Sequence, residues 1–245
     1  MKKKETKTGR VFACSDLHGM MPLYKQICDF LEPDDKVIYL GDAADRGPNG
    51  WELIKAIYHN PQWIYLCGNH EDMLANAIDE YTFKRSISKK HRQLLFDNGG
   101  KVTLFDWADD GADFEWSDIL RELPVHYIYK NVENKEIVLS HAGFHPFFNR
   151  DDMLPEDRED FIWDRDHIKL TSMFGWPSSL EDVILVHGHT PIQTMIQNYE
   201  PGALWYCDDH KICIDNASFF SGKTCLFDLD SYEEHVFEIP NFINQ

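Results

Sequence analysis

Short apolar runs that end abruptly in polar residues recur along the chain. Five of them are Val11–Cys14, Lys36–Leu40, Trp63–Cys67, Ile137–Leu139 and Val183–Val186. Runs of this length, rich in β-branched and aromatic residues, are typical of buried strands rather than of independent helices. The segments between the first strands have helical spacing, roughly over Pro22–Leu31, Trp51–Tyr58 and Glu71–Ile78. Alternating strands and helices predict an α/β fold, with functional residues in the loops that leave the strands.

The remaining segments extend this pattern. Residues 79–123 are predicted to form a mostly helical insertion, and a polar turn between Val125–Lys130 and Glu136–Leu139 predicts a hairpin. Residues 145–182 are rich in Asp, Pro and aromatic residues, so we expect a loop that lies over the site. The last strands are expected over Lys211–Ile214, Lys223–Leu229 and His235–Ile239. We therefore expect a single domain over residues 1–245.

Charge narrows the possible partners. The chain of 245 residues has 43% hydrophobic side chains, enough for one substantial core, and 42 acidic against 24 basic residues give a net charge of −18. Such a charge disfavours a partner bound through many phosphates over a wide surface, so we expect neither a nucleic-acid nor an anionic-membrane partner. An anionic ligand of any kind would need strong positive charge at its own site.

The cysteines and the N-terminus indicate the compartment. The six cysteines include no CxxC pair, and four of them lie within apolar runs, as small core residues would. No segment approaches the roughly 20 apolar residues that span a bilayer, and no apolar stretch follows the basic start. We therefore expect reduced thiols in a cytoplasmic protein that is neither secreted nor inserted in a membrane.

The polar residues after the five runs are of the types that bind metal ions. They stand in the blocks SDLHG, GDAADRGP, GNHE, SHAGF and VHGHT. Taken singly, Asp16 and His18 could be a capping residue and a surface histidine, while His141 and His189 could be hydrogen-bonded core histidines. Together, three Asp, one Asn and four His at one end of a sheet would destabilise one another without cations. The set therefore predicts a metal centre.

The kind of metal follows from the ligand types. Carboxylate, amide and imidazole ligands without thiolate suit Mn, Fe or Zn. More than four ligands imply two divalent ions, which can share one carboxylate and activate a water for attack on phosphorus. We expect manganese first, with iron or zinc as alternatives.

In this order, the five blocks resemble the phosphoprotein phosphatases of the calcineurin-like metallophosphoesterase family. The resemblance covers Asp16 to His189, about three quarters of the chain, and is nearest to the compact bacterial and phage type, such as the phosphatase of phage lambda. It implies a central β-sandwich of two mixed sheets flanked by helices, a four-layer metallophosphatase-like fold.

The resemblance also implies roles for individual residues. The first metal would be held by Asp16, His18 and Asp42, and the second by Asp42, Asn69, His141 and His189. His70 matches the general acid that protonates the leaving oxygen, and Asp45 matches the carboxylate that orients it and raises its pKa. Arg46 would hold the phosphate through its planar set of donors.

A second phosphate-binding arginine is expected between the last two histidine blocks. Arg165 resembles it in position, but Arg150 and Arg158 lie in the same segment, and any of the three could be a surface arginine paired with nearby acids. His187 lies beside a metal ligand and is interpreted as a structural neighbour.

One block departs from the family pattern. Ile214-Asp215-Asn216-Ala217 stands where relatives usually have an Asp-Thr-Gly turn. The departure leaves the ligands unaffected and puts the geometry of the loop near the site in doubt.

Several functions compete for this site. The first is a phosphomonoesterase that acts on phosphoserine or phosphothreonine in proteins, with phosphotyrosine as a further option, through a metal-bridging hydroxide and without a phosphoenzyme. The second is a symmetrical dinucleoside tetraphosphate hydrolase. Such relatives generally lack an acid at the position of Asp45, so this residue favours the first function. A scaffold that only keeps the fold would be expected to lack His70, Asp45 or Arg46, and a nuclease would need a basic track.

Overall fold

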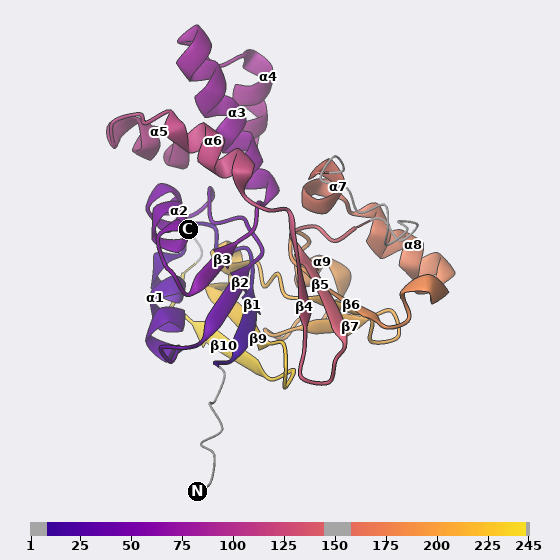
Figure 1. Cartoon of the computed structure of the whole chain (residues 1–245). Coiled ribbons are helices and arrows are strands. Elements are labelled where there is room, and N and C mark those ends of the chain that lie inside the picture. The colour runs from indigo at the N-terminus through magenta and orange to yellow at the C-terminus, as the bar shows by residue number, and fades with distance from the viewer. Residues whose placement is uncertain (1–8, 145–157, 244–245) are drawn as a thin grey trace, which may run out of the picture.

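Two five-stranded sheets form the centre of the protein. The computed structural model describes residues 9–144 and 158–243 (Figure 1). In the first sheet the strand order is β10 (Glu234–Glu238), β9 (Lys223–Asp228), β1 (Val11–Cys14), β2 (Lys36–Tyr39), β3 (Trp63–Tyr65). In the second the order is β4 (His126–Lys130), β5 (Glu136–Ser140), β6 (Val183–His187), β8 (Lys211–Cys213), β7 (Leu204–Tyr206). Both sheets are mixed, as the resemblance implied.

The parallel strands of each sheet carry the site. In the first sheet β1, β2 and β3 run parallel, and in the second β5, β6 and β8 do. The antiparallel strands lie toward the edges: β9 and β10 in the first sheet, β4 and β7 in the second. Because the carboxyl ends of parallel strands meet at one edge of a sheet, the loops that follow them are brought together there.

An apolar core fills the space between the sheets. Alternate residues of a strand point to opposite faces, so Ile38 joins the core between the sheets while its neighbours Val37 and Tyr39 pack with the helices. The second sheet contributes residues such as Leu139 and Val186 to the same core. This arrangement is the predicted β-sandwich.

Helices flank the sheets. On the outer face of the first sheet lie α1 (Met21–Phe30) and α2 (Gly50–Tyr58) (Figure 1). On the side of the second sheet lie α7 (Arg158–Trp163), α8 (Asp166–Phe174) and the short α9 (Ile192–Met195). The one-turn helix α10 (Ser218–Ser221) precedes β9.

The segment between β3 and β4 is helical. It contains α3 (Asn69–Lys84), α4 (Lys89–Asp97), α5 (Lys101–Asp109) and α6 (Glu115–Glu122), which extend beyond the sheets at the top of Figure 1. Helix α3 is twice the length expected from Glu71–Ile78, and its first turn holds residues of the site. The helices of the predicted insertion therefore begin at the site itself.

One expectation was wrong, and one strand was missed. Residues 145–182 were expected to be a loop, but in their described part, 158–182, α7, α8 and a 3₁₀ turn at Ser178–Leu180 are helical. Acidic and aromatic residues line these helices, which hid their spacing. Strand β7 was not expected, because a three-residue, partly exposed edge strand carries too short a pattern to recognise. Within the described ranges, no helix has the length and apolar character needed to cross a bilayer.

Candidate metal centre

The loops after five parallel strands bring the predicted ligands together at one end of the two sheets. Two groups of three side chains there could each hold a metal ion. Within each group, the ligand atoms all lie within 4.8 Å of one another. The first group is His18, Asp42 and His70, and the second is Asp42, His141 and His189. Asp42 belongs to both groups, which is the position expected of a shared ligand.

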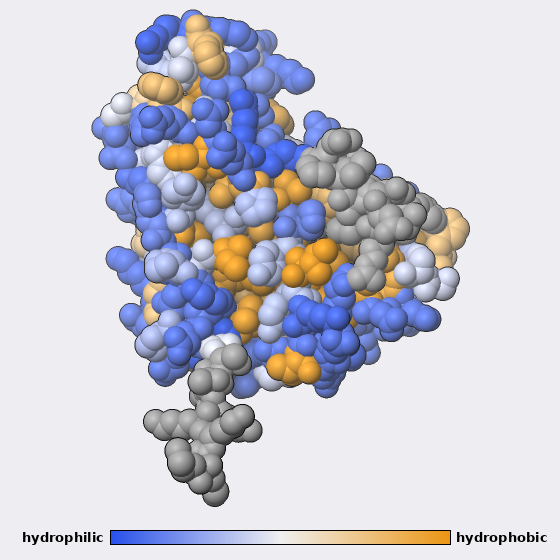
Figure 2. All heavy atoms as spheres, in the orientation of Figure 1, coloured by the Kyte–Doolittle hydropathy of each residue, from blue (hydrophilic) through white to orange (hydrophobic). Residues whose placement is uncertain are grey.

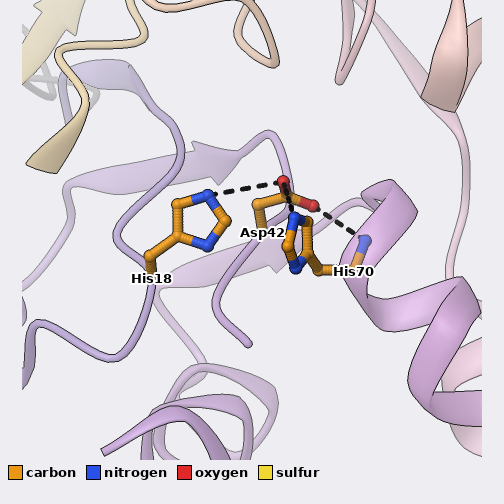
Figure 3. A group of neighbouring side chains, drawn as sticks. All are labelled: His18, Asp42 and His70. Carbon is orange, nitrogen blue, oxygen red and sulfur yellow. Dashed lines mark hydrogen bonds and ion pairs between the residues drawn. The ribbon is translucent and has the colours of Figure 1, made fainter. Parts of the chain in front are cut away.

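Asp42 faces three imidazoles. Its Oδ2 lies 3.6 Å from Nε2 of His18 and 3.7 Å from Nε2 of His70 (Figure 3). The same oxygen lies 3.4 Å from Nε2 of His141. Burial, together with the charges of Asp16 and Glu71, raises the pKa of Asp42 well above its ordinary value. An ionised Asp42 therefore needs a cation beside it.

His18 is oriented as a metal ligand. Its Nδ1 donates to the carbonyl oxygen of Ala44 at 2.8 Å, which leaves the lone pair on Nε2. That Nε2 is buried without a hydrogen-bond partner and points toward Asp42. A ring nitrogen fixed in this way by a backbone carbonyl is the usual arrangement of a metal-binding histidine.

Three side chains place ligand atoms close together on the side of the second metal: His141, His189 and Asn69. Nε2 of His141 lies 3.0 Å from Nδ1 of His189, and Oδ1 of Asn69 lies 2.9 Å from each. The Nδ1 of His141 donates to the carbonyl of Leu40 at 2.9 Å, so its Nε2 carries a lone pair. Nε2 of His141 and Oδ1 of Asn69 are both acceptors, and with Nδ1 of His189 unprotonated a third lone pair would join them, so a divalent cation would relieve their repulsion. The residues present therefore fit the expected metal.

Asp16 links the two groups. Its Oδ2 accepts a hydrogen bond of 3.0 Å from the backbone N–H of His189, and its Oδ1 lies 3.9 Å from Nε2 of His18. The side chain is 1% exposed, so it belongs to the same buried cluster.

The backbone at the site is strained. Positive φ angles of 43° to 69° occur at Asp16, His18, Asp42, Asp45, Arg46 and His189. Residues with a Cβ rarely adopt this region, at a cost of about 1 kcal/mol or more each, and such residues gather at functional sites. Six of the ten residues singled out from the sequence share this feature, which supports their grouping as one site.

His70 and Asp45 form a buried pair beside the first group. Nδ1 of His70 donates to Oδ2 of Asp45 at 2.8 Å, and Nη2 of Arg46 donates to Nε2 of His70 at 3.2 Å. Burial raises the pKa of Asp45 to about 7. The backbone N–H of Asp45 donates to Oγ1 of Thr103 at 3.0 Å, so α5 supports the loop that carries the pair.

The pKa of His70 differs from expectation. Asp45 was expected to raise it, but burial, followed by the charge of Arg46, lowers it well below the ordinary value. Burial removes the water that stabilises the imidazolium, and the guanidinium repels it. The arrangement is therefore that of neutral His70, and an anion next to the ring would favour the protonated form.

The three candidate arginines occupy different places. Arg165, exposed at the start of α8, contributes to lowering the pKa of His141 and His189, mainly caused by burial, so its charge acts on the site. Arg158 instead donates to the carbonyl of Leu123 at 3.2 Å and to Sγ of Cys67 at 2.9 Å, as a structural residue does. Arg150 lies outside the described residues.

Glu71 is a supporting residue for which no role was predicted from the sequence. Its buried carboxylate accepts backbone N–H groups from the loops after β2 and β3: Asp42 at 2.7 Å, Ala43 at 2.8 Å, Ala44 at 3.2 Å and Gly68 at 2.9 Å. It therefore fixes the loop of the shared ligand to the start of α3. The signal was present in GNHE, where this glutamate stands in the first turn of a helix.

A second polar cluster lies behind the metal centre. His187 is engaged on both ring nitrogens, at 2.9 Å with the carbonyl of Gly188 and at 2.6 Å with the hydroxyl of Tyr206. Buried Lys211 contacts Nδ1 of His167 at 2.5 Å and the carbonyl of the same residue at 3.2 Å. Both ring nitrogens of His187 thus have partners other than the ligands, in line with its structural interpretation. No sequence pattern pointed to His167 or Lys211.

The block that departs from the family pattern forms a closed turn. Oδ1 of Asp215 accepts from the N–H of Ala217 at 2.8 Å, and Oδ1 of Asn216 accepts from the N–H of Gly202 at 2.8 Å. The side chain of Asn216 also donates to the carbonyl of Gly202 at 2.9 Å. The amide of Asn216 therefore ties this loop to the segment before β7.

Curated proteins of two activities resemble the chain. A serine/threonine-protein phosphatase of Caenorhabditis elegans is 25% identical over 96% of this chain and 48% of its own length. The chain thus spans about half of that relative. An asymmetrical bis(5'-nucleosyl)-tetraphosphatase of Halalkalibacterium halodurans, PrpE, is 23% identical over 73% of this chain and 77% of its own length.

Solved structures share the fold. A candidate diadenosine tetraphosphatase matches with a TM-score of 0.61 at 16% identity, covering 97% of this chain and 96% of that one. A protein serine/threonine phosphatase of Saccharomyces cerevisiae matches with a TM-score of 0.58 at 12% identity, covering 98% and 83%. The sequence profile described as calcineurin-like phosphoesterase matches residues 9–229. With the ligand loops at the ends of the parallel strands, this match shows that the chain belongs to the calcineurin-like phosphoesterase family.

Proposed function

We propose that the chain is a metal-dependent phosphomonoesterase that acts on phosphoserine or phosphothreonine in proteins, with phosphotyrosine as a further substrate. The observation that carries the proposal is the buried pair of His70 and Asp45, 2.8 Å apart, beside two groups of metal-ligand side chains. A site with ligands alone could bind a metal without catalysis. The pair adds a group that can move a proton.

The ligand sets support two divalent ions, with manganese expected first and iron or zinc as alternatives. Asp16, His18 and Asp42 would hold the first, and Asp42, Asn69, His141 and His189 the second. When bound, the ions would supply positive charge for the phosphate and lower the pKa of a water that attacks phosphorus. Their charge also offsets the net charge of −18 that repels an anionic substrate.

The remaining residues bind the substrate and transfer a proton. Arg46 presents its guanidinium at Nε2 of His70 and would pair with the phosphate oxygens, with Arg165 as a second donor. A phosphate anion beside His70 raises the pKa of the imidazole, so that Nε2 can carry the proton for the leaving oxygen. Asp45 holds Nδ1 and thereby fixes the direction in which Nε2 points.

A symmetrical dinucleoside tetraphosphate hydrolase is the alternative. The relatives named as tetraphosphatases favour a dinucleoside tetraphosphate substrate without favouring symmetrical cleavage, since the curated one is named as asymmetrical. Trp163, whose ring centre lies 6.3 Å from that of His189, could stack on a base. Asp45 favours the monoesterase, because the resemblance places an acid there in monoesterases. We also infer that residues 1–245 form a single metallophosphoesterase domain in which 79–123 is an insertion.

Parallel assays test the proposal. Purified protein loaded with Mn, Fe or Zn should hydrolyse a phosphopeptide and a generic aryl phosphate, without a trapped phosphoenzyme. Turnover of the dinucleoside tetraphosphate alone would establish the alternative. A covalent phosphoenzyme would rule out direct attack by water.

A further inference from the structure

Among the described residues of this acidic chain, 84–92 form a strongly basic surface segment. Five Lys and Arg side chains lie within residues 84–92, and residues 81–96 include no Asp or Glu. The segment forms the end of α3, the turn after it and the start of α4. We call it the basic turn, and its members are Lys84, Arg85, Lys89, Lys90 and Arg92.

The charge of the basic turn is largely uncompensated. All five side chains are exposed, and the region they occupy is predominantly hydrophilic (Figure 2). Lys84 pairs with Glu80 at 3.0 Å. Among the described residues, no carboxylate lies within 4.0 Å of Lys89, Lys90 or Arg92. These cations are therefore free to bind an external anion.

Both helices of the basic turn lead to the site. Helix α3 begins at Asn69, and the chain after α4 reaches Gly99, whose carbonyl accepts from the N–H of Arg46 at 3.3 Å. At 1.5 Å per residue, Lys89 lies about 12 Å from the far end of α4, and Lys84 about 21 Å from His70. An extended peptide covers these spans in about four and six residues.

A pocket lies beside the basic turn. Its volume is about 380 Å³, and its lining includes Lys90 of the basic turn and Trp163, the neighbour of His189. Met73 and Leu94 add apolar surface to it, and Asp72 and Glu159 add two carboxylates. Those carboxylates repel a polyphosphate placed in the pocket. The lining of the pocket therefore suits a neutral or basic group of a substrate. The other four cations of the basic turn lie outside this lining.

We propose that the basic turn binds an acidic segment of a phosphoprotein substrate, about four to six residues from the phosphorylated residue. This inference rests on the proposed phosphoprotein phosphatase function and adds the kind of sequence it prefers. Because the chain has a net charge of −18, an acidic substrate is repelled except where local cations lie within a Debye length of about 10 Å. The basic turn provides such cations at the ends of the two helices, α3 and α4, that lead to the metal centre.

Charge reversal tests the inference. The variant Lys89→Glu with Lys90→Glu is compared with Lys25→Glu with Lys130→Glu, exposed lysines on α1 and β4, so that both variants change the net charge equally. The substrates are phosphoserine peptides with Glu or with Gln at positions four to six from the phosphoserine, on either side, and an aryl phosphate. Each is measured at low and high salt.

We expect the wild-type protein to prefer the Glu peptide through a lower KM, and the preference to weaken in salt. Reversal at Lys89 and Lys90 should reduce kcat/KM for the Glu peptide about five- to tenfold and leave the aryl phosphate and the Gln peptide within twofold. The control variant should keep the preference. Equal turnover of the Glu and Gln peptides by the wild-type protein, or an equal loss of kcat/KM in both variants, would refute the proposed role of the basic turn. The proposed phosphatase function would then still stand. Failure to hydrolyse any peptide would instead refute the proposed function, and this inference with it.

Discussion

Nδ1 of His70 donates a hydrogen bond of 2.8 Å to Oδ2 of Asp45, and neither residue has measurable exposure to solvent. The same imidazole has its Nε2 3.7 Å from Oδ2 of Asp42. The ring thus stands between a carboxylate that orients it and a carboxylate that is the candidate shared ligand. Two roles are open to it, metal ligand or acid, and they can be separated by experiment.

The variant His70→Asn should retain its metal and lose most of its rate. Removing a general acid typically costs about 10² to 10⁴ in kcat, whereas the ligand sets proposed for the ions do not include His70. Metal content by elemental analysis and kcat with an aryl phosphate are the measurements. Loss of metal together with rate would identify His70 as a ligand instead.

The variant Asp42→Asn should lose binding of both ions, because Asp42 belongs to both groups of ligand atoms. Wild-type protein should be stabilised by added Mn, with a Tm that rises with metal concentration, since the ions bind the folded chain. In Asp42→Asn this rise should be small. Asp34→Asn, an exposed change, is the control and should keep the wild-type response.

Arg165 and Arg158 should behave differently when changed to Ala. Arg165→Ala should raise KM about tenfold with little change in Tm, because the side chain is exposed and acts through its charge. Arg158→Ala should lower Tm, because it removes donors to the carbonyls of Leu120 and Leu123. The reverse outcome would assign the phosphate to Arg158.

Glu71→Gln should destabilise the protein by roughly 3 kcal/mol, because a neutral amide cannot accept all the backbone N–H groups that the carboxylate accepts. Urea unfolding measures the loss, and Glu52→Gln on the exposed face of α2 is the control. An effect no larger than that of the control would mean that water replaces the carboxylate at these N–H groups.

Lys211 should make stability depend on pH. Burial lowers the pKa of its amine from 10.5 to about 7, so the unfolded chain binds a proton that the folded chain lacks between these two values. The contribution of Lys211 to the free energy of unfolding therefore increases as pH rises from 7 toward 10.5. Below pH 7 the cost of burying the charged amine is fully present, and the protein is destabilised by this group.

The matched variant Lys211→Met isolates this contribution. Its free energy of unfolding relative to wild type should be highest below pH 7 and fall by on the order of a few kcal/mol toward pH 10. Taking the difference cancels the buried tyrosines and cysteines common to both proteins. The exposed Lys25→Met, measured in the same way, is the matched control.

The central strands could be predicted because they are buried apolar runs bounded by polar loops, and the family resemblance implied their arrangement as a sandwich. The ligands lie at the ends of those runs, so the residues of the site could be proposed before their geometry was known. Helices α7 and α8 were missed because acidic and aromatic residues line them and hid the helical spacing of their apolar positions. The roles of Glu71, His167 and Lys211 depend on partners distant in the sequence, and no local pattern identifies them.

His187 was expected to be a structural neighbour of the ligands, and both of its ring nitrogens have partners outside the two ligand groups. The pKa of His70, in contrast, shifts in the direction opposite to the expected one. The expectation for His70 considered one neighbour, Asp45. In the structure, burial has the largest effect on the pKa of His70 and the charge of Arg46 the second largest. Both lower this pKa, whereas Asp45 was expected to raise it. Proximity in sequence showed which groups would meet, but the balance of their effects required the packed structure.

The hydroxyl of Thr103 accepts a hydrogen bond from the backbone N–H of Asp45, and the carbonyl of Gly99 accepts one from the backbone N–H of Arg46. The helical segment therefore contacts the loop that carries Asp45 and Arg46 at two points. A chimera that replaces this segment with that of a homologue would therefore change turnover as well as substrate choice. Evolution of new specificity through these helices is constrained at the same two contacts, and engineering of the segment should keep Gly99 and Thr103 fixed.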